Sequence, residues 1–125
     1  KINFNDNKIV SFQCDLEQIN RSIFNLIKNS IESIKEKREK NVDYQGEINI
    51  ELFERNEYIS IIIKDNGNGF TNKIKKELIK PYFTTKKNGS GLGLSIVNKI
   101  VVDHNGLLNL SNTNDGAKVE IIFYK

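Results

Sequence analysis

A carboxylate follows an apolar, β-branched run of the sequence, and two glycines come just behind it. The six residues are DNGNGF (65–70), which follow YISIIIK (58–64). An EF-hand calcium loop is excluded, because its glycine position falls on Phe70 and its last acidic position on Lys76. Two interpretations stay open. One is a tight Asn-Gly hairpin; the other is a carboxylate that accepts an exocyclic amine such as that of adenine, beside glycines that let a planar ring approach.

Asn25 and Asn29 stand four residues apart in NLIKNSIESI, so they share one face of a predicted helix. Arg21, Glu32 and Glu36 fall on the same side, and the apolar stripe lies largely opposite. This pattern fits a plain solvent-exposed face. It also fits an amide oxygen that binds a hard cation, since Mg²⁺ commonly takes few protein ligands and adds water and phosphate oxygens.

A third stretch, PYFTTKKNGSGLGLSIV (81–97), brings three glycines to the start of a predicted helix. It is neither a Walker A loop, which ends in Gly-Lys-Ser/Thr, nor a GxGxxG turn after a strand. Small residues expose successive amides and a helix N-terminus adds partial positive charge, so the stretch suits phosphate as well as it suits a flexible linker. The residues concerned are Gly89, Gly91 and Gly93, with the hydroxyls and cations of Thr84, Thr85, Lys86 and Lys87 upstream.

The single histidine and the single cysteine are expected to be chemically quiet. His104 falls at the C-terminal end of a predicted helix, where an imidazole suits the helix dipole without being catalytic. Cys14 has no disulfide partner within the chain and no metal-ligand spacing around it, so we expect a small buried thiol and a reducing compartment.

The composition is that of one soluble globular domain covering residues 1–125. Of these residues 38% are hydrophobic and 28% are charged, and the net charge of +3 is spread along the chain. No basic block interleaved with aromatics suggests nucleic acid. No apolar run reaches membrane-spanning length or opens the chain as a signal peptide. Because residue 1 is not methionine, we expect the chain to be a fragment of a longer protein.

Hydrophobic periodicity predicts the elements that must position these stretches. Asp15 and Gln18 form a capping box at the start of a long amphipathic helix, which frays in the charged run KEKREK (35–40). The start of the chain, 1–14, alternates and suits two short strands, of which 9–14 is the better. The other expected elements are strands at 48–54, 58–64, 107–113 and 118–125, a short helix at 73–79 closed by Pro81, and a helix at 92–104 ended by Asn105-Gly106. Strands grouped in hairpins among helices indicate a helical layer on one face of a mixed sheet.

The order of these stretches resembles that of the ATP-binding catalytic domain of bacterial sensor histidine kinases, in the GHKL or Bergerat-fold superfamily. An Asn-x-x-x-Asn helix comes first, then Asp-x-Gly-x-Gly after a strand, Phe-Thr-Thr-Lys, and Gly-x-Gly-Leu-Gly-Leu at a helix start. They match the asparagine box, first glycine box, phenylalanine box and second glycine box of that family, and the likeness spans about 15–125. PYFTTK with GSGLGLSIV points to the kinases rather than to DNA gyrase, heat-shock chaperones or mismatch-repair ATPases.

The resemblance implies an α+β fold, a two-layer α/β sandwich with a mixed, mostly antiparallel sheet and helices on one face. It implies ATP and Mg²⁺ between two helices under a lid at about 72–90, with Asn29 as the metal ligand. Asp65 would hold the adenine amine, and Phe83 would pack at the base of the lid. The implied nucleotide-binding residues are Asn25, Asn29, Asp65, Gly67, Gly69, Phe83, Thr84, Thr85, Lys86, Gly89, Ser90, Gly91, Leu92, Gly93 and Leu94.

One position pair departs from the family pattern. Many members carry a basic residue and then an aromatic residue three and four places after the second asparagine, where this chain has Glu32 and Ser33. A phosphate contact and an adenine-stacking ring from this helix are therefore not carried over. The shorter pattern resembles the nitrogen-regulation type of sensor kinase.

The resemblance implies a protein histidine kinase domain of a two-component system. It would transfer the γ-phosphoryl group of ATP to a histidine on a separate dimerisation/phosphoacceptor domain of a homodimeric parent, and a response regulator would follow. That domain is not in this chain, so we expect no autophosphorylation. We expect a cytoplasmic location, no membrane contact by the chain, and a parent that could be anchored in the inner membrane. The alternatives are a stand-alone serine kinase of the anti-sigma-factor type and a non-catalytic module, either nucleotide-binding or with a degenerate pocket.

Overall fold

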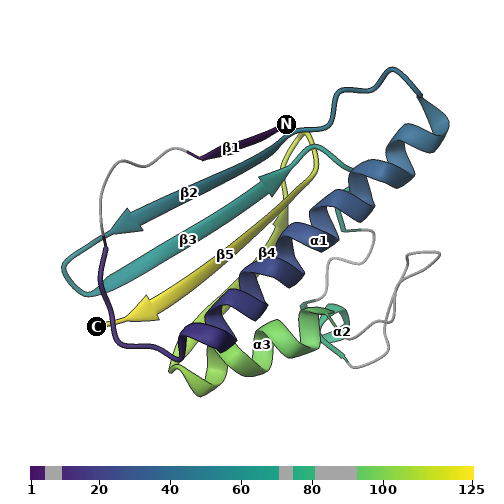
Figure 1. Ribbon diagram of the computed structural model, residues 1–125. Coiled ribbons are helices and arrows are strands. Elements are labelled where there is room, and N and C mark those ends of the chain that lie inside the picture. Colours follow the sequence, from purple (N-terminus) through teal and green to yellow (C-terminus); the bar gives the residue numbers. More distant parts are fainter. Residues whose placement is uncertain (5–9, 71–74, 81–92) are drawn as a thin grey trace.

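Helices cover one face of a five-stranded sheet in the computed structural model, which describes residues 1–4, 10–70, 75–80 and 93–125 (Figure 1). The strands are β1 (Ile2–Phe4), β2 (Ile48–Glu54), β3 (Tyr58–Asp65), β4 (Gly106–Asn112) and β5 (Ala117–Tyr124). The helices are α1 (Leu16–Lys40), α2 (Lys75–Leu78) and α3 (Gly93–Asp103). The expected α+β class and the helical layer on a mixed sheet are confirmed.

The strand that carries the DNGNGF carboxylate lies at the centre of the sheet. The strand order is β1-β2-β3-β5-β4, with β1 parallel to β2 and the other pairs antiparallel. The apolar run of β3 is the reason for its central place, because Ile59 and Ile63 are 0% and 1% exposed. The register pairs Asp65 with Ile48, so the carboxylate stands at the last rung of β3, next to the start of β5.

The long helix α1 is capped at both ends. The Asp15 carboxylate accepts a hydrogen bond from the Gln18 amide at 3.2 Å, as the capping-box pattern predicts. The expected fraying over 35–40 is wrong, since α1 runs 25 residues to Lys40. Its charged end consists of strong helix formers, with opposite charges four residues apart at Lys35/Glu39 and Glu36/Lys40. Lys37 also anchors this end, because its Nζ donates to the Asn66 carbonyl at 3.3 Å.

The core lies between the helical layer and the sheet. Helices α1 and α3 pack side by side over the strands (Figure 1). Leu26 of α1 is 2% exposed and Val97 of α3 is 0% exposed, and they share one apolar cluster with Ile63 and Ile121 of the sheet. Burying each such side chain stabilises the fold by about 1.5–3 kcal/mol. No helix in the described ranges is both long enough and apolar enough to cross a membrane.

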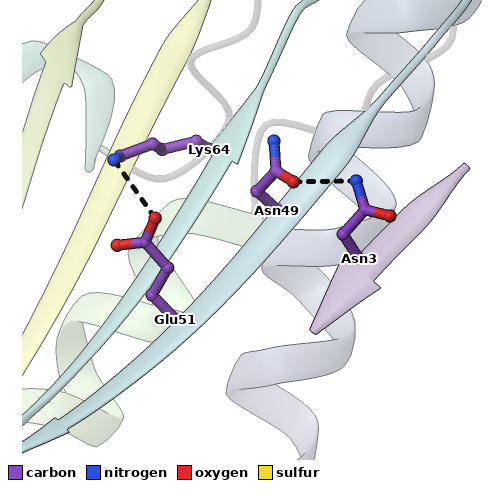
Figure 2. A network of polar contacts seen from close by, with 4 residues as sticks. All are labelled: Asn3, Asn49, Glu51 and Lys64. Carbon is purple, nitrogen blue, oxygen red and sulfur yellow. Dashed lines mark hydrogen bonds and ion pairs between the residues drawn. The ribbon is translucent and has the colours of Figure 1, made fainter. Parts of the chain in front are cut away.

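The other face of the sheet is polar near β1. Figure 2 shows Asn3 and Asn49 joined by a 2.9 Å hydrogen bond, and Lys64 paired with Glu51 at 3.4 Å. These side chains alternate with the apolar residues of the same strands, as expected for a sheet with one covered face. The helices therefore cover one face of the sheet only.

The predicted strand at 9–14 is wrong in its described part, because residues 10–14 have no regular secondary structure. Side chains fix this segment instead of strand pairing: the Phe12 ring stacks on Phe123 with centroids 5.1 Å apart. The same extended path leaves Cys14 exposed, so the expected buried thiol is also wrong. Strand β1 forms earlier in the chain, and residue 9 lies outside the described residues.

Two helix boundaries also shift. The short helix predicted at 73–79 is a single turn, Lys75–Leu78, while residues 73 and 74 and Pro81 lie outside the described residues. The helix predicted at 92–104 begins at Gly93 and ends at Asp103. Asn105 takes a positive φ of 55° just beyond this helix, in line with its expected role as a helix stop.

Truncating a buried apolar residue of α1 should lower the stability of the fold more than truncating an exposed one. We expect Leu26→Ala to lower the free energy of unfolding by about 2–5 kcal/mol, because a cavity would replace a fully packed side chain. Phe24→Ala on the same helix is the matched control, since Phe24 is 66% exposed. Chemical denaturation of both variants measures the difference, and equal losses would contradict this account of the core.

Candidate functional site

The Asp65 carboxylate is held by one oxygen and open at the other. The residue is 7% exposed, and its Oδ1 accepts hydrogen bonds from the amides of Gly67 at 2.9 Å and Ala117 at 3.5 Å. Its Oδ2 has no partner among the residues that the structure describes. Within those residues only the Ser22 hydroxyl is both fully enclosed and unpaired, so Oδ2 keeps access to solvent. A fixed, accessible acceptor at a strand end can receive an N–H donor from a ligand.

The two glycines behind Asp65 allow close packing of the backbone around this carboxylate. A Cβ on Gly67 would lie 2.4 Å from the Ser33 hydroxyl oxygen, and one on Gly69 would lie 2.9 Å from Asn112 Oδ1. Gly69 also has a positive φ of 74°, which disfavours any side chain. The tight-hairpin interpretation of this stretch is wrong, because the next described element is the helix α2 rather than a returning strand.

Asn66 ties the same stretch to the connection between α1 and β2. Its side-chain oxygen accepts from the Glu47 amide at 2.7 Å, and its side-chain nitrogen donates to the Gln45 carbonyl at 2.9 Å. Its own carbonyl accepts from the Tyr44 hydroxyl at 2.6 Å, and the Tyr44 ring in turn lies 4.4 Å from Lys37 Nζ. These contacts fix the backbone that carries Asp65 and Gly67.

The asparagine face of α1 meets the N-terminus of α3. Asn29 is half-buried, and its amide oxygen lies 3.4 Å from the position that a Cβ on Gly93 would take. Gly93 is the first residue of α3, where backbone N–H groups are left without helical partners and carry partial positive charge. Asn25, one turn earlier on α1, is also half-buried. A plain solvent-exposed face therefore does not describe Asn29, which packs against another helix.

One turn of α1 links the two halves of the candidate site. Ser33 follows Asn29 by four residues, so both lie on the same face about 6 Å apart along the helix axis. Asn29 lies beside the start of α3, and Ser33 lies against Gly67 behind the carboxylate. The structure thus brings Asn29, Gly93, Asp65 and Gly67 around one stretch of helix.

Part of the predicted set lies outside the described residues. The described members are Asn25, Asn29, Asp65, Gly67, Gly69, Gly93 and Leu94. The others, together with most of the expected lid at 72–90, are not described; they are Phe83, Thr84, Thr85, Lys86, Gly89, Ser90, Gly91 and Leu92. Within the described ranges, no three His, Cys, Asp or Glu side chains gather as a metal-binding cluster.

His104 has a structural place at the far end of α3. Its Nδ1 lies 2.8 Å from the Ile100 carbonyl, and its Nε2 accepts from the Asp15 amide at 3.1 Å. A ring nitrogen that accepts is unprotonated, so Nδ1 carries the proton in this arrangement. The imidazole therefore joins the end of α3 to the cap of α1.

Two residues that contact the candidate site were not predicted to belong to it. Ser33 Oγ accepts from the Asn68 amide at 2.9 Å, and the Asn112 side chain bonds both backbone groups of Phe70. The sequence marked Ser33 only as a departure from a family pattern. For Asn112 it offered no signal, because the contact joins positions 42 residues apart.

The family of this chain follows from a comparison with known proteins. The model of the family described as histidine kinase-, DNA gyrase B- and HSP90-like ATPases matches residues 14–125. The chain therefore belongs to this family, and the resemblance to the ATP-binding domain of sensor histidine kinases is confirmed.

Similar curated proteins are sensor kinases. A protein named as an NtrY-like sensor histidine kinase of Rickettsia conorii is 40% identical over 113 residues, which cover 90% of this chain and 18% of that protein. The nitrogen regulation protein NtrY of Azorhizobium caulinodans is 35% identical over 102 residues, covering 82% of this chain and 13% of that protein. The chain thus spans less than a fifth of the length of these relatives.

Solved structures agree on the fold. The catalytic domain of histidine kinase ThkA superposes with a TM-score of 0.81 at 27% identity, covering 99% of this chain and 80% of that one. A mycobacterial sensor histidine kinase, MprB, has a TM-score of 0.76 at 19% identity, covering 99% of this chain and 79% of that one. The second likeness concerns the fold alone.

The packing of Gly67 against Ser33 can be tested by stability. We expect Gly67→Ala to lower the free energy of unfolding by about 1–3 kcal/mol, because its Cβ would overlap the Ser33 side chain and approach the Ser33 backbone. Gly93→Ala is the control, since its nearest contact would be an ordinary 3.4 Å and alanine favours a helix. Denaturant titration decides; a Gly67→Ala variant as stable as the parent chain would contradict the observed packing.

Proposed function

We propose that this chain binds Mg·ATP and donates its γ-phosphoryl group to a histidine on a separate dimerisation/phosphoacceptor domain of the parent protein. The observation that carries the proposal is the open Oδ2 of Asp65 at one end of a helix face whose other end, at Asn29, meets the start of α3. The sensor-kinase relatives support the choice of a histidine rather than a serine acceptor.

The base would bind beside Asp65. A carboxylate only accepts hydrogen bonds, so its open oxygen suits the amino group of adenine and disfavours the carbonyl that guanine has in that place. Gly67 and Gly69 leave backbone without side chains next to the carboxylate, which gives a flat ring room to approach. The Oδ1 contacts to two amides keep the carboxylate oriented before any ligand arrives.

The phosphates would lie toward Asn29 and the first turn of α3. The amides at the start of α3 and its partial positive charge favour phosphate oxygens. The amide oxygen of Asn29 fits one position in the shell of a hard cation, with Asn25 near the phosphates. The metal, when bound, neutralises phosphate charge. What the chain itself contributes is position, since phosphoryl transfer needs no covalent help from the protein.

The rest of the reaction would come from other parts of a larger protein. We propose that the chain is one domain, residues 1–125, of a homodimeric two-component sensor kinase whose product passes to the receiver domain of a response regulator. The placement of His104 supports a structural role for it rather than that of a phosphoacceptor. We propose a cytoplasmic location for this domain, with any membrane anchor carried elsewhere in the parent.

A conservative change at Asp65 tests the base site. We expect Asp65→Asn to weaken ATP binding about tenfold or more and to reduce the preference for ATP over GTP, because an amide can also donate. Asp115→Asn, in an exposed turn, is the matched control. Titration with a fluorescent ATP analogue, with and without Mg²⁺ and with ATP or GTP as competitor, measures both effects. Wild-type affinity and selectivity in Asp65→Asn would remove the base site from this position.

Phosphoryl transfer should require the separate domain. Incubated alone with γ-labelled ATP, the chain is expected to stay unlabelled; with the purified dimerisation domain of its parent added, label should appear on a histidine of that domain. Asn29→Ala should abolish this transfer, whereas His104→Ala should not. Acid-labile label on His104 of the isolated chain, or acid-stable label on a serine of a partner, would contradict the proposed reaction.

A further inference from the structure

We propose that Ser33, where the chain departs from the family pattern, and Asn112, which lies outside the four sequence motifs, are positioning residues that hold the 65–70 backbone in its base-binding shape before nucleotide arrives. The inference rests on the proposed function, since it concerns the same base site. It adds two residues to that site and predicts which part of the ligand they affect.

Ser33 fixes the middle of this backbone from the side of α1. The residue is 8% exposed, and its hydroxyl oxygen accepts from the Asn68 amide at 2.9 Å. The same oxygen would lie only 2.4 Å from a Cβ placed on Gly67. Ser33 thus both bonds Asn68 and sets how closely the backbone at Gly67 packs on the helix. A larger residue at 33 would displace that backbone.

Asn112, on the edge strand β4, fixes the end of the same backbone. Its Oδ1 accepts from the Phe70 amide at 2.7 Å, and its Nδ2 donates to the Phe70 carbonyl at 2.8 Å. Through these two bonds the Asn112 side chain pairs with the Phe70 backbone in the way that a neighbouring strand would. Asn112 is the last residue of β4, so the outer strand of the sheet is joined to the loop that leaves its central strand.

Together these contacts leave the loop with little freedom. Asp65 bonds Gly67, Asn66 is tied to the connection between α1 and β2, Asn68 is bonded to α1, and Phe70 is bonded to β4. A binding loop that is already ordered loses less conformational entropy when its ligand binds. Loss of either Ser33 or Asn112 should therefore weaken contacts to the base and leave contacts to phosphate near Asn29 and the start of α3 unchanged.

The test compares two probes that report on the two halves of the site. Adenosine and inorganic tripolyphosphate with Mg²⁺ are used separately to displace a fluorescent ATP analogue. We expect Ser33→Ala and Asn112→Ala each to weaken adenosine and ATP by about three- to tenfold, the range for one or two lost hydrogen bonds. Tripolyphosphate affinity should stay within about twofold, since its contacts lie elsewhere. A residue that merely stabilised the fold would lower both affinities alike.

Two further variants and one direct measurement sharpen the result. Ser30→Ala, buried on the same helix, and Asn109→Ala, on the same strand, are the matched controls and should leave all three affinities unchanged. Asn112→Asp keeps an acceptor for the Phe70 amide but sets its second oxygen against the Phe70 carbonyl, so it should bind adenosine no better than Asn112→Ala. In the nucleotide-free chain, the Asn68 amide should lose hydrogen-exchange protection in Ser33→Ala, and the Phe70 amide in Asn112→Ala.

The outcomes separate this inference from the function on which it rests. If the wild-type chain binds ATP but the variants bind adenosine normally, or lose adenosine and tripolyphosphate equally, the positioning role is wrong and the proposed function stands. If the wild-type chain binds no adenine nucleotide, the proposed function fails, while the exchange measurement still shows whether the two side chains order the loop. Should Ser33→Ala fail to fold, the Asn112→Ala and Asn109→Ala pair still decides.

Discussion

The two hydrogen bonds to one oxygen of Asp65 are the constraint on which the arrangement of this site depends. A carboxylate that is 7% exposed is costly unless donors reach it, and the amides of Gly67 and Ala117 do so through Oδ1. Both donors are backbone groups of neighbouring chain segments. The loop behind β3 and the start of β5 must therefore hold their places for the carboxylate to be tolerated, and Gly116 permits this by packing without a side chain against the Asp65 carbonyl.

Helix α1 connects the surroundings of Asp65 to the start of α3. One of its faces is fixed by Leu26 and its neighbours in the core, so its position relative to the sheet is not free. The adjoining face then presents Asn29 to α3 and Ser33 to the loop at Gly67. Because both contacts come from one rigid helix, the spacing between the loop at Gly67 and the start of α3 is set by core packing. The capping of α1 by Asp15, which also donates to His104, extends this control to the end of α3.

The sequence predicted the parts of the structure that depend on local pattern. The helix cap at Asp15, the hairpin of β2 and β3 and the position of Asp65 at a strand end all follow from periodicity and capping rules. The wrong expectations concern residues whose state depends on distant partners: residues 10–14 are held by the contact of Phe12 with Phe123 rather than by strand pairing. The contacts of Ser33 and Asn112 were invisible for the same reason, because they join positions 35 and 42 residues apart.

The position of Ser33 suggests why a small residue suits this turn of α1. Its hydroxyl satisfies a backbone donor that would otherwise be partly buried without a partner, and its small volume lets Gly67 approach the helix. An aromatic side chain at 33 would have to displace that backbone, so a ring stacked on the base from this position and the observed closeness of loop and helix exclude each other. The backbone of the loop is instead held by Ser33 on one side and by Asn112 on the other. The departure from the common family pattern at Ser33 is thus matched by polar contacts that fix the same part of the site.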